Sequence, residues 1–100
     1  MINCLHHFIS MARARVIFKG KVQGVWFRAN CQKKALELGL VGWVRNLPDG
    51  NVESIIEGPR SLIVDFIDWN RSSQPFARVR DMDIEWETEK GDLDTFSVIR

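Results

Sequence analysis

The residues with the clearest chemical potential lie in one short segment, GKVQGVWFR at residues 20–28. The segment joins the end of an expected strand to the first turn of an expected helix. Unpaired backbone N–H groups and the helix dipole favour an anion at such a junction. Arg28 stands in that first turn, where a cation opposes the dipole at a cost of about 0.3–1 kcal/mol. A residue that breaks a local rule in this way indicates a functional position.

The chemistry that this segment suits is recognition of a phosphoryl or carboxylate group. A guanidinium offers a planar fork of donors, and converging amides add further hydrogen bonds. The alternative is that Arg28 only faces solvent or pairs with a surface carboxylate. The segment is not a Walker P-loop, because Val22 replaces the hydroxyl residue that would hold Mg²⁺ and the upstream glycine is absent. The spacing of Gly20 and Gly24 is weak evidence, since both glycines can serve the turn alone.

Asn46 is the second candidate, at the end of a strand expected over residues 41–46 and just before the turn Leu47-Pro48-Asp49-Gly50. Its neutral amide can accept a hydrogen bond from a water and donate another elsewhere. A carboxylate at this point would repel an anionic substrate. The alternative is that Asn46 caps the turn through its own backbone.

Other groups fit structural roles better. Cys31 falls on the apolar stripe of the expected first helix, which is typical of a small buried hydrophobe rather than a nucleophile. Trp43, Trp69 and Trp86 are interpreted as packing residues. Acidic residues alternate along one expected strand, a pattern typical of a solvated face that discourages aggregation; they are Asp81, Asp83, Glu85, Glu87 and Glu89.

Composition limits the classes of protein that remain. A chain of 100 residues with 45% hydrophobic and 27% charged residues is expected to form one globular domain. The net charge of +1 predicts no long-range attraction to nucleic acid or to a membrane surface. The two cysteines are too few for a disulfide framework, which favours a reducing cytoplasm. No apolar run approaches the roughly 20 residues that span a bilayer, and no signal peptide is recognised.

Periodicity predicts the elements that position the candidate residues. Apolar residues alternate from Arg13, then recur at helical spacing from Phe27 to a C-capping Gly39. Residues 41–46 and 51–57 are expected to pair through an Asp-Gly turn. A second helix is expected to open with Pro59 at its first position and to end near Arg71. Two more strands follow, around residues 81–87 and 96–98.

The order β-α-β-β-α-β-β predicts an α+β fold of the ferredoxin-like, split βαβ type. Two helices would cover one face of a mainly antiparallel sheet, with an added C-terminal strand. Residues 1–12 show no periodicity and are expected to be a flexible N-terminal extension, with the domain itself over residues 13–100. Cys4, His6 and His7 in that extension lack a further ligand that would complete a metal site.

The motifs also resemble a known family. GKVQGVWFR at residues 20–28, GWVRN at 42–46 and DGNVE at 49–53 are closely similar to the two signature segments of the acylphosphatases. The resemblance covers about residues 13–100, including Gly58-Pro59. It implies the fold derived above and hydrolysis of the carboxyl–phosphate bond of acyl phosphates, without a metal or cofactor.

The resemblance also implies site residues. Arg28 matches the family's substrate-binding arginine, and Asn46 matches its water-orienting asparagine. The family's phosphate loop corresponds in this chain to Gln23, Gly24, Val25, Trp26 and Phe27. Outside the extension the chain has no histidine, which agrees with a reaction whose carboxylate leaving group needs no proton. A phosphate oxygen of the substrate is the expected acceptor of the water's proton.

The sequence therefore predicts a cytoplasmic, monomeric acylphosphatase with a small acyl phosphate as substrate and inorganic phosphate as product and competitive inhibitor. Trp26 is a candidate to contact the acyl portion. Two alternatives stay open. An RNA-binding module of the same fold would be expected to carry an aromatic-rich strand motif that is absent here. A regulatory anion sensor would keep the loop without turnover.

Overall fold

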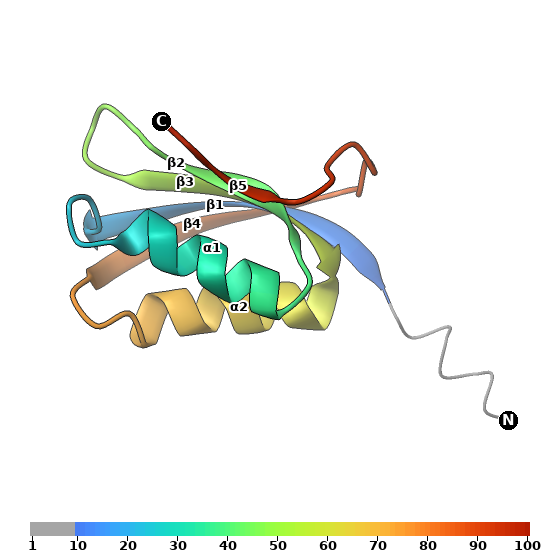
Figure 1. The fold of residues 1–100 in the computed structure, drawn as a ribbon, viewed down its shortest axis with the longest axis horizontal. Coiled ribbons are helices and arrows are strands. Elements are labelled where there is room, and N and C mark those ends of the chain that lie inside the picture. The colour runs from blue at the N-terminus through green and yellow to red at the C-terminus, as the bar shows by residue number, and fades with distance from the viewer. Residues whose placement is uncertain (1–9) are drawn as a thin grey trace, which may run out of the picture.

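The computed structural model describes residues 10–100, and Figure 1 shows its two helices packed on one face of a single sheet. The strands are β1 (Met11–Lys21), β2 (Val41–Asn46), β3 (Val52–Pro59), β4 (Arg78–Glu87) and β5 (Phe96–Ile99). The helices are α1 (Phe27–Glu37) and α2 (Arg60–Ser72). The predicted ferredoxin-like, split βαβ fold with an added strand is confirmed.

The strand order is β4-β1-β3-β2-β5, and every neighbouring pair is antiparallel except β2 and β5. In the parallel pair, Gly42 lies opposite Phe96 and Arg45 lies opposite Ile99. Gly42 has a φ of +148°, and a Cβ there would lie 1.9 Å from the Ile55 carbonyl oxygen, so only glycine fits. Because β5 runs alongside β2, the residue after β5 reaches the end of β2, where Asn46 stands.

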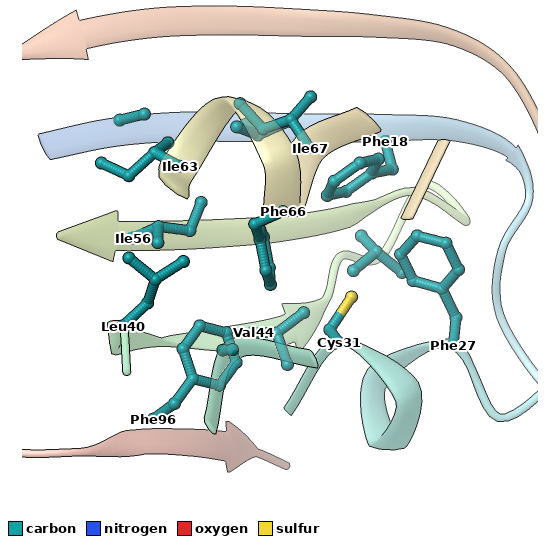
Figure 2. Close-up of a cluster of buried hydrophobic side chains, with 14 of the residues drawn as sticks. Phe18, Phe27, Cys31, Leu40, Val44, Ile56, Ile63, Phe66, Ile67 and Phe96 are labelled. Carbon is teal, nitrogen blue, oxygen red and sulfur yellow. The ribbon is translucent and has the colours of Figure 1, made fainter. Parts of the chain in front are cut away.

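The core lies between the sheet and the helices, and aromatic side chains join the two layers (Figure 2). Phe18 of β1 meets Phe27 of α1 edge to face, with ring centroids 5.1 Å apart. Phe66 of α2 meets Phe96 of β5 at 5.7 Å. Burial of one such side chain is worth about 1.5–3 kcal/mol. Phe27 is the first residue of α1, so its burial anchors the helix start that carries the next residue, Arg28.

The starts of β1 and α2 differ from the prediction. Strand β1 begins at Met11, and Met11 pairs with Pro59, so the last two residues of the expected extension belong to the sheet. Pro59 was expected at the first helical position, and this is wrong. Its ψ of 131° is extended and it ends β3, so α2 begins one residue later. The rest of the expected extension, with Cys4, His6 and His7, lies outside the described residues.

The open face of the sheet carries a network of ion pairs. Its basic members come from β1 and β2, and its acidic members come from β3, β4 and the following loop. We call this network the ion-pair face; it contains Arg13, Arg15, Lys19, Arg45, Glu53, Glu57, Asp83, Glu85, Glu87 and Asp92. Three of the five acidic residues that were interpreted as a solvated face therefore have cationic partners on β1, although Asp83 and Glu85 remain exposed.

Neither helix within residues 10–100 is long and apolar enough to cross a membrane.

Candidate active site

The loop between β1 and α1 turns sharply because two of its residues adopt left-handed backbone conformations. Gly24 has φ +73° and Trp26 has φ +65°. Glycine adopts this conformation without cost, whereas a bulky side chain such as tryptophan does so only under strain. Backbone in such turns forms concavities into which successive N–H groups converge. The loop has this form directly before the first turn of α1.

The N–H groups at this point have no partner among the residues that the structure describes. Within residues 10–100, the amides of residues 24–28 donate to no backbone or side-chain acceptor. Trp26, the N-cap, makes no side-chain capping hydrogen bond, and the first turn of α1 holds no acidic residue. Free donors at the positive end of a helix dipole bind anions. The loop therefore has the donors and the local dipole that suit an anionic group.

Arg28 follows this loop in the first turn of α1 and is half-buried. Its Nη1 donates to the carbonyl oxygen of Ile99 at 3.2 Å. No carboxylate in the described part of the chain forms an ion pair with it. One hydrogen bond to a neutral acceptor orients the guanidinium and leaves its other donors available.

Arg28 and Asn46 open onto the same hollow, which has a volume of about 420 Å³. Of the predicted site residues, Gly24, Trp26, Phe27, Arg28 and Asn46 all line it. Trp26 is 73% exposed and forms part of its rim. The hollow therefore brings together residues from the β1–α1 loop, α1 and the end of β2.

Gln23 and Val25, which were also predicted in the substrate-binding loop, do not line the hollow. Val25 is buried in the core. The Gln23 amide nitrogen, Nε2, donates to the carbonyl oxygens of Leu47 at 2.8 Å and Asn51 at 2.9 Å. Its side chain thus ties the loop to the β2–β3 turn, one residue beyond Asn46. This tie holds the loop and the Asn46 strand end in one arrangement.

Asn46 is exposed, and its side chain makes no hydrogen bond to any residue among 10–100. The alternative, that Asn46 caps the following turn, receives no support from the turn's geometry. Asp49 makes that contact, because its Oδ1 accepts from the backbone N–H of Asn51 at 3.0 Å. The Gly50 N–H donates to the carbonyl oxygen of Leu47. The amide of Asn46 is available to a water or a substrate.

The hollow is also lined by residues that the sequence did not indicate, among them Gln32, Val98 and Arg100. Gln32 lies four residues after Arg28, and that spacing puts both on one face of α1. Its Nε2 donates to the carbonyl oxygen of Phe96 at 3.0 Å. Arg100 had no local signal, because its position depends on the pairing of β5 with β2.

Cys31 has no accessible surface and lies in the core, as predicted. Burial raises the pKa of its thiol well above the usual range, and a hydrogen bond from Gln74 opposes this only in part. The protonated thiol is not a nucleophile. Across residues 10–100 there is no group of three or more His, Cys, Asp or Glu side chains arranged to hold a metal ion.

The fold and this hollow together define a class of protein. It is a split βαβ domain whose first strand–helix loop carries N–H groups without an acceptor among residues 10–100 and is followed directly by an arginine. A family model described as Acylphosphatase matches residues 14–98.

Individual relatives agree with the family model. An acylphosphatase of Aeropyrum pernix is 47% identical over 90 residues, which are 89% of this chain and 89% of that protein. An acylphosphatase of Methylococcus capsulatus is 46% identical, over 90% of this chain and 98% of that protein. The crystal structure of acylphosphatase from Bacillus subtilis matches with a TM-score of 0.85 and 34% identity, over 89% of this chain and 99% of that one. The chain belongs to the acylphosphatase family of enzymes.

Proposed function

We propose that this protein hydrolyses acyl phosphates with Arg28 and the amides of residues 24–28 holding the phosphoryl group and Asn46 orienting the water. The observation that carries the proposal is the set of unpaired donors around one hollow. Backbone amides without an acceptor among residues 10–100, and a guanidinium whose one hydrogen bond there goes to the Ile99 carbonyl oxygen, lie at the same hollow. A phosphoryl group has the charge and the acceptor oxygens to satisfy both.

In the proposed reaction, the water oxygen attacks phosphorus while the bond from phosphorus to the acyl oxygen breaks. The carboxylate leaves with that bond's electron pair and needs no proton, because it is a stable anion at neutral pH. The water's proton passes to a phosphate oxygen of the substrate. The protein's task is positioning and charge stabilisation, which dominate phosphoryl transfer in general.

Asn46 suits the role of holding the water because it is uncharged and unpartnered. Its amide oxygen can accept a hydrogen bond from the water while its NH₂ group donates elsewhere. The tie from Gln23 to the carbonyl oxygens of Leu47 and Asn51 supports a constant distance between this amide and the loop. Errors of about 1 Å in such a distance cost up to roughly 10²-fold in rate.

Trp26 is proposed to contact the acyl portion of the substrate. Its indole is exposed at the rim, and its strained φ keeps it beside the loop. The side chains of Gln23 and Val25 support the loop's shape instead, so their part in binding would come through the backbone alone.

The proposal is tested by a continuous assay with benzoyl phosphate, with an alkyl phosphomonoester as the control substrate. Turnover is expected for the acyl phosphate only, because the alkoxide leaving group of the monoester needs a proton that this site has no acid to supply. Activity is expected to persist in EDTA, and inorganic phosphate is expected to compete. Phosphate binding without turnover of benzoyl phosphate would identify an anion sensor instead.

The same proposal includes a cytoplasmic, monomeric protein without a nucleic-acid or membrane partner. The balanced charge and the low cysteine content support it. Size-exclusion chromatography with light scattering measures the oligomeric state directly, and a mass near 11.6 kDa is expected.

A further inference from the structure

Arg100 stands beside Asn46 because β5 pairs in parallel with β2. The register places Arg45 opposite Ile99, so the next residues of the two chains, Asn46 and Arg100, are neighbours. In Figure 1 the chain beyond β5 runs toward the end of the sheet that carries the β1–α1 loop and the β2–β3 turn. Both residues line the hollow.

Alternation along the strands puts Arg100 on the helix-covered side of the sheet. Val98 packs against the core, and residues two apart in a strand share a face. Arg28 donates to the carbonyl oxygen of Ile99, the residue directly before Arg100. The two arginines therefore line the same hollow from two different elements, one from α1 and one from the segment after β5.

The side chains that line the hollow carry a net positive charge. Arg28 and Arg100 both line it, and none of its lining residues is acidic. The chain as a whole has a net charge of only +1. On the ion-pair face, by contrast, each arginine has a carboxylate partner. Throughout residues 10–100 no carboxylate forms an ion pair with Arg100.

Arg28 and the loop amides already supply the donors that one phosphoryl group needs. Arg100 does not belong to that loop; it lies with Val98 and Gln32 on the β5 side of the hollow. A bound acyl phosphate has two ends, and the phosphoryl end occupies the loop. The acyl end is therefore the part of the substrate that Arg100 can reach.

We propose that Arg100 binds a second anionic group on the acyl portion, so that the preferred substrates are acyl phosphates that also carry a carboxylate or phosphate group. This inference rests on the proposed function above. A guanidinium recognises either anion through paired hydrogen bonds. Arg100 then determines specificity, and it takes no part in breaking the phosphorus–oxygen bond.

The test compares three substrates with the same aromatic ring, namely benzoyl phosphate, 4-carboxybenzoyl phosphate and the neutral 4-carbamoylbenzoyl phosphate. The Arg100→Gln variant is expected to lose about 10-fold or more in kcat/KM for the carboxylated substrate, as is typical of a lost charged hydrogen bond. Less than a twofold change is expected for the other two. The loss should fall mainly on KM, and Arg100→Lys should restore part of it.

The matched control is Arg80→Gln, which removes the same charge from an exposed arginine of β4 outside the hollow. It is expected to leave all three kcat/KM values unchanged. Thermal unfolding of each variant should match that of the unsubstituted protein, since both side chains are exposed.

Two results would overturn the inference. An equal loss on all three substrates would mean that Arg100 contacts the phosphoryl group, and no loss on any would mean that it contacts no substrate. Failure of the unsubstituted protein to hydrolyse even benzoyl phosphate would instead overturn the proposed function, and the inference with it.

Discussion

The arginines of the ion-pair face and those of the hollow are used in opposite ways. Arg13 is 7% exposed and its Nη1 lies 3.2 Å from Glu57 and 3.1 Å from Asp92. Arg28 and Arg100 form no ion pair with any residue from 10 to 100. Arginine side chains thus form ion pairs on the ion-pair face, whereas in the hollow they stay accessible to solvent and ligand.

The pKa values show how closed the ion-pair face is. Burial alone would raise the pKa of Glu57, but backbone N–H groups of Lys90 and Gly91 together with Arg13 lower it. Burial would likewise raise the pKa of Glu53, but hydrogen bonds and charge attraction from Arg15 and Arg45 outweigh this and lower it. Each anion is held charged by donors from the protein itself. In the hollow, no carboxylate from residues 10–100 pairs with Arg28 or Arg100, so their donors stay available to a ligand.

The largest expected effect on activity comes from removing Arg28 from the hollow. Arg28→Ala is expected to lower kcat/KM for benzoyl phosphate by about 10³-fold or more, since it removes charge stabilisation in the transition state. Arg28→Lys should also be severely impaired, because an ammonium lacks the planar fork. Steady-state kinetics measures both, and Arg71→Ala on the exposed side of α2 is the control. Near-normal activity in Arg28→Ala would show that the arginine of the hollow has no functional role distinct from those of the ion-pair face.

Breaking the closed network should affect stability instead of turnover. Glu57→Gln removes the most buried of the three carboxylates that pair with Arg13, and a lost hydrogen bond between charged groups typically costs about 1.5–3 kcal/mol. Denaturant unfolding measures the loss, and Glu85→Gln, an exposed carboxylate of the same network, should cost less than about 1 kcal/mol. The folded fraction of Glu57→Gln is expected to keep its kcat. A large fall in kcat with unchanged stability would reverse the roles of the two regions.

The same carboxylates predict the direction of acid unfolding. Their folded-state pKa values lie below the ordinary value of 4.5, so they stabilise the fold above that pH. Their contribution is lost as the pH falls from about 4.5 through the lowered pKa values. The stability difference between the unsubstituted protein and Glu57→Gln should therefore be largest at neutral pH and shrink in acid. A difference that grows in acid would contradict the assigned charge.

Asn46→Ala separates binding from chemistry within the hollow. Its kcat is expected to fall by about 10²-fold, because the attacking water loses its orientation. Binding of inorganic phosphate, measured by calorimetry, is expected to persist, since the loop amides and Arg28 are untouched. A near-normal kcat would remove Asn46 from the mechanism.

A smaller effect is expected from the tie between the loop and the β2–β3 turn. Gln23→Leu leaves the carbonyl oxygens of Leu47 and Asn51 without this donor, and each lost hydrogen bond costs about 0.5–1.5 kcal/mol. If the tie also positions Asn46, kcat should fall at temperatures where the variant is fully folded. Lost stability with an unchanged kcat would limit Gln23 to a structural role.

The smallest effect is expected at the N-terminus. Removal of residues 1–9 is proposed to leave activity and melting temperature unchanged. Removing Ser10 as well takes away the carbonyl oxygen that accepts from the Arg60 N–H at the start of α2, a loss of about 0.5–1.5 kcal/mol. Differential scanning calorimetry of the two shortened chains makes the comparison. A marked loss on removing residues 1–9 alone would show that the extension stabilises the domain.

The sequence by itself determined the order of elements and the location of the β1–α1 loop that we propose to bind the phosphoryl group. Periodicity reports which side chains face a core, and it identified β2 and the start of α1 at Phe27 correctly. Arg28 was found because it breaks a local rule of helix electrostatics, and that rule needs no knowledge of the remaining chain. These are properties of residues a few positions apart.

The tertiary structure alone decided which strands pair and which residues lie opposite one another. Pairing of β1 with β4 turned an apparently solvated acidic strand into part of the ion-pair face. Pairing of Met11 with Pro59 kept that proline in a strand rather than a helix. The parallel register of β2 and β5 brought Arg100 to Asn46. Each depends on contacts between residues more than forty positions apart, and local propensity carries no information about which distant partner a strand will meet.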